Sequence, residues 1–451
     1  MKSRFISDMM RRLFFFLASA MLLLTACSDN DSFTTDRSSR LTFSRDTVQL
    51  DTLFSAVPSV TYTFWIYNRA SDGLRISTAR LEKGNQTGFR VNIDGTFLNP
   101  VGQNFEIRQG DSLRVFVEIT SYENHSTTPQ LVEDNLLLTL ESGVEQRVNL
   151  RTYSWDAEKL TSLVVARDTT IESSKPLVLY GDGITVSPEA TLTLKNTTLF
   201  FHSDARLLVE GRLDAEGCLF RGDRLDHMFA YLPYDRVSGQ WRGIQVAKQA
   251  EGCFLTDSEV RSAWDGIVAD STVVSLTNTV VHNNRGYGLY AADSDVQLYE
   301  CLLSNAEDDC LALHGSTAVV DQCTLAQFYP LTANRGAALC FAPTDDHPSK
   351  LTCTNTLMTG YADDVMTGLA SDGETSFYQF SNCLIRTPEI TGDEGFTDIL
   401  WETPKDEFQG TQHFLLVDGQ NLIYDFTIKQ DSPAYEPHIG RSFEPQETPN
   451  P

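Results

Sequence analysis

The chain has 451 residues, of which 41% are hydrophobic and 21% are charged, and these values indicate a globular protein of two or three domains. It contains 61 acidic and 35 basic residues, which gives a formal net charge of −26 at pH 7. This excess argues against nucleic acid and anionic lipid surfaces as partners, because both require clustered Lys and Arg.

Residues 1–26 have the pattern of a secretory signal peptide. Four basic residues precede an apolar run of 14 residues, 13–26, which is too short to span a bilayer. The run ends in Leu24-Thr25-Ala26-Cys27, which resembles the lipobox of bacterial lipoproteins. This resemblance implies cleavage before Cys27 and lipidation of Cys27, with palmitate among the attached acyl chains.

Ser28-Asp29-Asn30-Asp31 follows the cysteine and resembles the acidic surface-export signal of lipoproteins in some Gram-negative groups. The resemblance implies an outer-membrane protein that is held by its lipid anchor and exposed at the cell surface. Residues 27–40 are mostly polar and lack proline, so we expect them to form a flexible lipidated tether.

Residues 41–155 show strand patterns without a long repeat. Six or seven short segments, among them TYTFWIYN and DSLRVFVEIT, alternate apolar and polar residues and are separated by turns such as Ser71-Asp72-Gly73. This spacing predicts an immunoglobulin-like (Ig-like) β-sandwich that serves as a spacer. We expect Trp65 and Phe116 to lie in its core.

A repeat of 22 residues governs the next part of the chain. Segments that begin at Trp264, Gly286 and Asp308 align at this shift and place Gly266, Gly288 and Cys310 in one column. Such a period predicts an all-β solenoid, a right-handed parallel β-helix with about 22 residues in each three-strand coil. We assign residues 156–430 to it, with a C-terminal segment that caps the open end of the stack, and residues 431–451 to a tail.

A second column of the repeat holds only small residues. Its predicted members are Thr198, Cys218, Ser258, Thr279, Cys301, Cys323, Thr356 and Cys383. A position that exchanges Cys for Ser and Thr selects a small inward side chain, so we expect most of the eight cysteines after Cys27 to be buried free thiols.

Two insertions follow the third strand of a coil, at 223–240 and at 326–336. Uninterrupted coils separate them, so we expect two walls about 15–20 Å apart with a groove between them. Tyr231 and Tyr234 would belong to one wall, and Phe328 and Tyr329 to the other. The floor would carry Trp264, His282, Asn284, Arg285 and Tyr287. Aromatic rings beside convergent polar groups are suited to binding a carbohydrate chain.

Asp308-Asp309-Cys310 resembles the Asp-Asp-Cys signature of polygalacturonase-type β-helix glycosidases. The resemblance implies that the paired aspartates act with another Asp to protonate the glycosidic oxygen and activate water. Here Tyr287 lies one coil earlier and Asp265 two coils earlier, roughly 10 Å away by the usual coil spacing. The Gly-His-Gly and Arg-x-Lys motifs of that family have no match.

A lyase is a further alternative, because Asp265 and Glu307 lie on the same turn as the paired aspartates. Asp308 and Asp309 are then candidate ligands for Ca²⁺, with Arg285 or His282 near the abstracted proton. No other metal or cofactor motif occurs in the sequence.

The chain as a whole resembles the broad group of bacterial β-helix surface lipoproteins. We expect its β-helix to bind a polysaccharide or to act in adhesion without catalysis. Two alternatives stay open: a polysaccharide hydrolase or lyase that uses Asp265, Glu307, Asp308 and Asp309, and a structural surface scaffold. The expected partners are the membrane, through the lipid anchor, and a polysaccharide, but not nucleic acid. The sequence does not indicate an oligomeric state.

Overall fold

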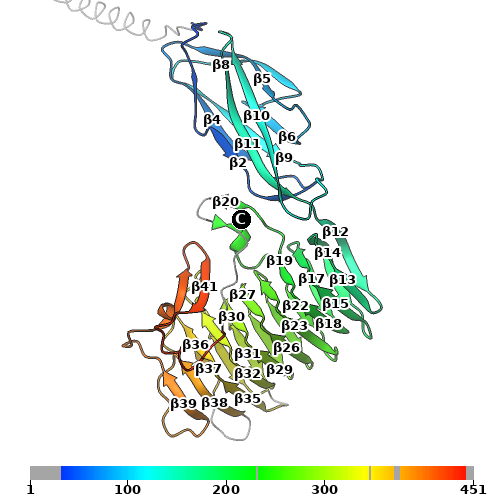
Figure 1. Cartoon of the computed structure of the whole chain (residues 1–451), viewed down its shortest axis with the longest axis vertical. Coiled ribbons are helices and arrows are strands. Elements are labelled where there is room, and N and C mark those ends of the chain that lie inside the picture. The colour runs from blue at the N-terminus through cyan, green and yellow to red at the C-terminus, as the bar shows by residue number, and fades with distance from the viewer. Residues whose placement is uncertain (1–31, 230–231, 345–346, 370–375, 443–451) are drawn as a thin grey trace, which may run out of the picture. The chain divides into compact units, whose positions relative to one another are not determined.

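The computed structural model describes residues 32–229, 232–344, 347–369 and 376–442, which form two compact units (Figure 1). The first unit contains the described residues up to Leu50, together with Ala56–Tyr122 and Leu131–Tyr153. The second contains Asp51–Ser55, Glu123–Gln130 and the chain from Ser154 onward. Among the described residues, no helix has the length and apolar character needed to cross a bilayer.

The first unit is a β-sandwich of two sheets. One sheet has the order β1 (Leu41–Phe43), β4 (Tyr62–Asn68), β9 (Ser112–Ile119), β6 (Phe89–Ile93) and β7 (Thr96–Phe97). The other has the order β2 (Thr47–Gln49), β11 (Glu145–Trp155), β10 (Gln130–Leu140), β5 (Leu74–Leu81) and β8 (Val101–Ile107), and β3 (Leu53–Phe54) pairs with β11. Alternate residues such as Phe64, Ile66, Val115 and Val117 are buried, as expected for strands with one face on the core.

Two expectations for this part of the chain are wrong. Trp65 is 40% exposed and Phe116 is half-buried, because both lie at the strand positions that alternate with the buried ones. The tether does not extend to residue 40. Phe33 forms a β-bridge with Gly73, and the Arg75 guanidinium lies 4.7 Å from the Phe33 ring centre.

The second unit is a right-handed parallel β-helix, as predicted, whose strands form one 26-stranded parallel sheet wound into three faces. The first face contains β17 (Arg206–Val209), β22 (Ile244–Val246), β25 (Ile267–Asp270), β28 (Leu289–Ala292), β31 (Leu311–His314), β34 (Leu339–Ala342) and β37 (Met366–Thr367). The second contains β13 (Thr169–Glu172), β15 (Thr191–Lys195), β18 (Arg212–Glu216), β23 (Gly252–Thr256), β26 (Val273–Thr277), β29 (Asp295–Tyr299), β32 (Thr317–Asp321) and β35 (Ser349–Thr354). The third contains β16 (Thr198–Phe201), β19 (Leu219–Gly222), β24 (Glu259–Arg261), β27 (Val280–Asn284), β30 (Leu302–Ala306), β33 (Thr324–Gln327) and β36 (Leu357–Gly360).

Longer strands occur at the two ends of the solenoid. These are β12 (Glu158–Val165), β14 (Leu177–Val186), β38 (Ser376–Ile385) and β39 (Phe396–Trp401). Both β14 and β38 continue from one face to the next, because each pairs with strands of two faces.

The strand register confirms the 22-residue period. Ile267 pairs with Leu289, and Leu289 pairs with Leu311 on the next coil. A residue with a positive φ, between 45° and 63°, turns the chain from the second face to the third in each coil of this column; it precedes seven members of the small-residue column directly and precedes Thr197 in the coil of Thr198. Asn, Asp and Gly tolerate this conformation best, and five of these eight positions are Asn or Asp. The residues are Asn196, Gly217, Asp257, Asn278, Glu300, Gln322, Asn355 and Asn382.

Side chains of the small-residue column form a hydrogen-bonded ladder inside the solenoid. The Cys323 thiol donates to the carbonyl oxygen of Asp321 and accepts the N–H of Cys301, while the Cys323 N–H donates to Thr356 Oγ1. One predicted member is wrong: Thr198 pairs with Leu219, so the inward residue level with Cys218 is the neighbouring Thr197. All eight described cysteines are free and seven are buried, with Cys340 half-buried.

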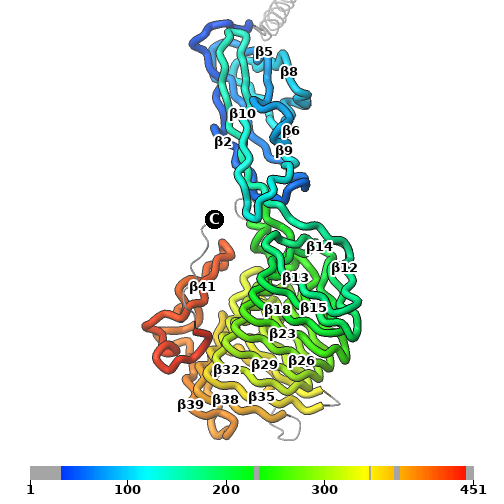
Figure 2. Tube along the Cα trace, turned by 45° about the vertical axis from the view of Figure 1, so that its right-hand side comes forward, coloured from blue at the N-terminus to red at the C-terminus, as the bar shows by residue number. Residues whose placement is uncertain are grey.

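The C-terminal segment covers a side of the solenoid. The hairpin of β40 (Phe414–Asp418) and β41 (Ile423–Ile428) follows the 3₁₀ turn η2 (Gly410–His413) and lies alongside the coils in two views (Figures 1 and 2). Phe414 and Phe426 pack on outward apolar residues of the third face, such as Leu302 and Leu357. The prediction that this segment caps the open end of the stack is therefore wrong. The segment instead covers the apolar outer side of the third face.

The chain then runs back across several coils as a strap, residues 438–441. The His438 carbonyl accepts a hydrogen bond from Gln322 Nε2, and the Gly440 N–H donates to the carbonyl of Asn355. The Arg441 N–H donates to Thr324 Oγ1, and its guanidinium donates to Asn278 Oδ1 at 2.6 Å. The strap therefore joins the coil of Asn278 to the adjacent coils of Gln322 and Asn355, from which another coil separates it.

Candidate functional site

The two insertions occur where the repeat predicted them, but they meet instead of forming separate walls. The first contains β20 (His227–Phe229), β21 (Leu232–Pro233) and the 3₁₀ turn η1 (Tyr234–Arg236). Ser238 Oγ in this insertion lies 2.8 Å from the Tyr329 hydroxyl in the other. Asn283 Nδ2 on the intervening coil donates to the carbonyl of Arg236. The predicted open groove between distant walls is therefore wrong.

A buried arginine fixes the first insertion. The Arg221 guanidinium donates to the carbonyls of Arg224 and Asp235, which lie at the start and near the end of the insertion. Burial lowers the pKa of Arg221 to about 9. Because backbone polar groups in a loop need partners, these bonds hold the insertion in its folded position.

Four predicted glycan-binding residues do not face an open groove. Phe328 and Tyr329 are 0% and 2% exposed, and Phe328 packs against Phe414 and Phe426 of the C-terminal segment. The His282 ring packs edge-on against Tyr424 of the same hairpin, and burial lowers the pKa of His282 to about 3. Asn284 is fully buried, and its Oδ1 accepts the N–H of Ala263.

Two other predicted glycan-binding residues, Trp264 and Arg285, lie on the surface. Trp264 is 41% exposed, and the Arg285 guanidinium carbon lies 4.5 Å from the centre of its ring, a cation–π pair. Gly239 of the first insertion lies beneath Arg285, because a Cβ built there would come within 2.9 Å of Arg285 Cδ. Tyr234 is half-buried with Arg224 over its ring at 4.3 Å. Tyr231 and Cys27 lie outside the described residues.

The four predicted carboxylates lie close enough to affect one another. Asp308 is exposed, and Asp265, Glu307 and Asp309 are half-buried. The pKa of Asp308 is raised, first by partial burial and then by the charges of Asp309, Asp265 and Glu307. Burial also raises the pKa of Asp265 and Asp309, against the lowering effect of one backbone N–H bond to each.

The backbone explains how these side chains come together. Asp265, Tyr287 and Asp309 occupy the same position on three consecutive coils, since the Gly266 N–H donates to Tyr287 and the Gly288 N–H donates to Asp309. Coils spaced roughly 4.8 Å apart put Asp265 and Asp309 about 10 Å from each other. Two carboxyl groups with raised pKa values on one surface have the chemistry of a general acid and a general base.

An aromatic strip that the sequence did not reveal continues from this cluster along the first face. The Tyr287 and Tyr290 ring centres lie 4.9 Å apart, and the Tyr290 ring stacks on His314 at 5.2 Å. His314 Nε2 lies 4.0 Å from the thiol of Cys340. The repeat does place Tyr290 and His314 at outward positions of the strands that follow the Gly266 column. Outward positions vary in residue type from coil to coil, so the repeat alone did not indicate an aromatic strip.

The described residues contain no group of three or more His, Cys, Asp or Glu side chains arranged to hold a metal ion. One oxygen of Asp309 is already engaged by the N–H of Ala337, and Glu307 accepts a hydrogen bond from the Tyr329 hydroxyl. Three of the four carboxylates, Asp265, Glu307 and Asp309, thus accept hydrogen bonds from backbone or side-chain donors.

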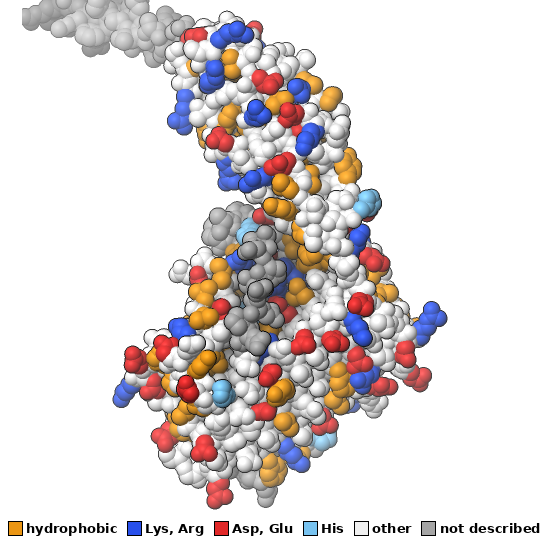
Figure 3. All heavy atoms as spheres, in the orientation of Figure 1, with side chains coloured by type: hydrophobic (Ala, Val, Ile, Leu, Met, Phe, Trp, Pro, Cys, Tyr) orange, Lys and Arg blue, Asp and Glu red, His pale blue; other side chains and the backbone are white. Residues whose placement is uncertain are grey.

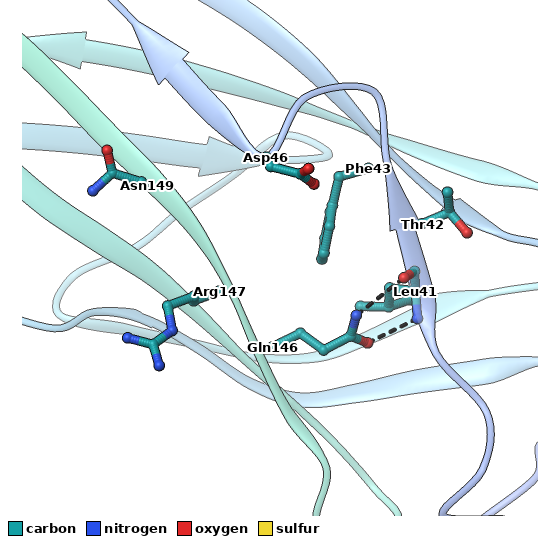
Figure 4. A pocket seen from close by; sticks show the side chains of 7 residues that line it. All are labelled: Leu41, Thr42, Phe43, Asp46, Gln146, Arg147 and Asn149. Atoms are coloured by element: carbon teal, nitrogen blue, oxygen red, sulfur yellow. Dashed lines mark hydrogen bonds between the residues drawn. The ribbon is translucent and has the colours of Figure 1, made fainter.

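Three pockets lie elsewhere on the molecule. One of about 550 Å³ lies at the edge of the β-sandwich and is shown in Figure 4. Its lining includes Gln146, whose side-chain amide forms two hydrogen bonds with the backbone of Leu41 and so links the two sheets. The others lie along the C-terminal strap. The four predicted carboxylates line none of these three pockets, and charges of both signs are interspersed on the face drawn in Figure 3.

Comparison with known proteins agrees with the fold of the second unit. Residues 237–332 match the family described as a right handed beta helix region. No curated protein matches the chain. A protein of unknown function from Porphyromonas gingivalis aligns at 12% identity and a TM-score of 0.20, over 30% of this chain and 59% of that one.

Two glycoside hydrolases are also among the solved structures that align. The catalytic unit of a GH87 alpha-1,3-glucanase from Streptomyces thermodiastaticus aligns at 10% identity and a TM-score of 0.19, over 76% of this chain and 89% of that one. A family 123 glycoside hydrolase from Clostridium perfringens aligns at 4% identity and a TM-score of 0.19, over 27% and 30%. Similarities this low do not extend to function.

Proposed function

We propose that this chain is a lipid-anchored outer-membrane protein whose β-helix binds a polysaccharide at the cell surface without cleaving it. The observation that carries the proposal is the exposed Trp264–Arg285 pair beside Asp265 and Asp308 on uninterrupted coils. An exposed tryptophan face offers a stacking surface for a sugar ring, and the neighbouring carboxylates accept hydrogen bonds from its hydroxyl groups.

The ligand class follows from the charges of the site. Two guanidinium groups lie by the Trp264 ring, that of Arg285 and that of Arg242 at 5.9 Å, and Arg242 also pairs with Asp204. The four carboxylates outnumber them and would repel a uronic acid chain, so a neutral polysaccharide or one that carries amino groups fits better. Tyr287, Tyr290 and His314 extend the surface over further coils, which suits a linear chain of several sugars. The two insertions contact each other over the adjacent turn and do not enclose a deep cleft. An open surface does not exclude water from a reacting bond, so this arrangement supports binding rather than cleavage.

Binding is tested with the soluble chain from Ser28 onward, by affinity electrophoresis in gels that contain neutral or amino-group-bearing polysaccharides. Trp264→Ala should abolish the retardation that one such polysaccharide causes. Tyr299→Ala is the matched control, because Tyr299 is an equally exposed aromatic residue elsewhere on the solenoid. Equal retardation of the wild type and Trp264→Ala would remove this surface from the proposal.

The anchor is tested separately in cells. Metabolic labelling with a palmitate analogue should mark the wild-type chain but not Cys27→Ser. Protease added to intact cells should then digest the labelled protein. A labelled Cys27→Ser variant, or complete protection from protease, contradicts the anchor or its outward position respectively.

Hydrolysis is a second candidate, which the raised pKa values of Asp265 and Asp309 favour. If Asp265 and Asp309 act as acid and base, incubation with a bound polysaccharide releases reducing ends. Asp309→Asn then stops release while retardation in the gel persists. Binding without any reducing ends rules out this candidate and leaves the binding proposal intact.

A further inference from the structure

The solvent-facing side of the five-stranded sheet in the first unit carries a row of aromatic side chains. Trp65 and Tyr67 on β4 and Phe116 on β9 point away from the core, since the residues that alternate with them are buried. Trp65 is 40% exposed, and the other two are half-buried. Alternate residues of one strand lie about 7 Å apart, so the three rings form a surface across two adjacent strands.

Two arginines lie over these rings. Arg114 pairs directly with Trp65 across the strands, and its guanidinium carbon lies 5.8 Å from the Trp65 ring centre and 4.8 Å from that of Phe116. Arg69 lies 5.5 Å from the ring centre of Tyr67. Other arginines of this unit, such as Arg75 and Arg90, form ion pairs with glutamates. Within the described residues, no ion pair involves Arg69 or Arg114.

We infer that this face binds a carboxylated polysaccharide, a chain that contains uronic acids. Trp65, Tyr67 and Phe116 provide the stacking surface for its sugar rings, and Arg69 and Arg114 bind its carboxylates. A guanidinium placed over an aromatic ring keeps N–H groups at its edge, and these match a carboxylate in a two-point hydrogen bond. Charge complementarity selects the ligand, because no carboxylate in the described part of the chain pairs with these two cations, although the protein has a net charge of −26.

This surface is independent of the proposed site on the solenoid, where carboxylates predominate over cations. Cross-strand pairing alone is the competing explanation, because aromatic and arginine side chains also stabilise neighbouring strands. The two explanations differ in a measurable way. Removal of a purely structural pair lowers the thermal midpoint and leaves ligand binding unchanged, whereas removal of a binding group weakens retention in a chain that still folds.

The experiment is affinity electrophoresis of the chain from Ser28 onward in gels that contain polygalacturonate, with dextran and dextran sulfate gels alongside. Arg114→Gln and Trp65→Ala should each weaken retention by polygalacturonate at least about tenfold, equivalent to roughly 1.4 kcal/mol. Arg80→Gln removes the same charge from an exposed position on the other sheet, and Tyr299→Ala removes an exposed aromatic side chain from the solenoid. Both controls should bind polygalacturonate like the wild type.

Lack of wild-type retention by polygalacturonate overturns the inference, as does unchanged retention of Arg114→Gln. Equal retention by dextran sulfate contradicts the choice of a carboxylate ligand. Thermal midpoints measured on the same samples show whether a variant failed because it unfolded, and in that case Arg69→Gln, at the strand end, repeats the test. Loss in Tyr299→Ala alone would assign polygalacturonate to the solenoid and not to this face.

Discussion

Asp308 illustrates how a single surface carboxylate responds to acidic neighbours in its own coil and two coils away. Partial burial and the charges of Asp309, Asp265 and Glu307 all disfavour its ionised form. A stack of coils repeats each turn position roughly every 4.8 Å, so acidic residues in one column repel each other across the stack. The native protein keeps this unfavourable arrangement, which is typical of residues retained for binding or catalysis.

Asp308→Asn should therefore stabilise the protein at neutral pH. A carboxyl group whose pKa is raised in the folded state destabilises that state once it ionises, so the effect is absent below the unfolded-state pKa of about 3.9 and complete above the folded-state pKa. The thermal midpoint of the variant should exceed that of the wild type at pH 7 and equal it at pH 3. Asp295→Asn, on a nearby coil, is the control that should change little at either pH.

The repeated coil is the element that the sequence describes best. Each coil must place its inward residues in register with those of the next coil. This steric requirement explains why the 22-residue period, the glycine column and the positions of both insertions could be predicted. The slip from Thr197 to Thr198 shows the limit of the pattern, because two adjacent threonines satisfy a small-residue column equally well. The burial of Phe328 and Tyr329 could not be predicted in the same way. It depends on where the C-terminal hairpin packs, and the residues of their own coil do not determine that position.

The ladder inside the solenoid predicts which substitutions a coil tolerates. Cys323→Ser keeps a donor for the Asp321 carbonyl and an acceptor for the Cys301 N–H, so the free energy of unfolding should change by less than about 1 kcal/mol. Cys323→Val has a similar size but leaves both groups unpaired, which should cost roughly 1–3 kcal/mol. Urea unfolding of both variants measures the difference, and equal losses would show that size alone governs this column.

A buried polar network attaches the hairpin to the third face. Glu402, which is 4% exposed, accepts hydrogen bonds from Arg386, from Thr359 Oγ1 and from His413 Nε2 at 3.2 Å. His413 is fully buried and lies between Glu402 and Ser432. Burial opposes ionisation of Glu402, but the bonds from His413 and Arg386 outweigh it and hold the pKa of Glu402 below its usual range.

Glu402→Gln should destabilise the protein by roughly 1.5–3 kcal/mol at pH 7, because the buried Arg386 guanidinium loses its buried carboxylate partner and keeps only the exposed Asp363. A depressed carboxyl pKa supplies stability above the unfolded-state pKa of about 4.3, and this stability is lost as the pH falls through the folded-state value. The gap between wild type and variant should thus narrow in acid. Denaturant titrations at pH 7 and pH 3 measure it, with the exposed Glu389→Gln as control. A gap that is constant with pH would contradict the ionic role.

At the scale of the whole molecule, the solenoid is incomplete without its C-terminal segment. Leu302, Leu357 and Leu384 form an apolar outer face that the segment from Phe414 to Ile439 covers. A β-helix that ended at its last strand would expose this face to water. Sequence patterns showed the strands of the third face but not this covering layer. The steps of the repeat are irregular here, so the sequence does not distinguish a leucine that points outward from one that points into the core.

A chain that ends after Trp401 should therefore bind a hydrophobic dye and aggregate, because contiguous apolar surface becomes exposed. A chain that ends after Ser442 keeps every described residue and should behave like the full-length protein. Dye fluorescence and light scattering of the two truncations measure the contrast. A soluble, dye-free chain ending at Trp401 would show that the third face needs no cover.

The strap at residues 438–441 changes how the solenoid unfolds. In a stack where each coil touches only its neighbours, the end coils open one at a time and the loss of one costs little to those far from it. Here backbone and side-chain bonds from His438, Gly440 and Arg441 join the coils of Asn278, Gln322 and Asn355. These coils consequently open as one cooperative block, whose amide hydrogens share a common free energy of opening, and fraying from the C-terminal end stops where the strap begins.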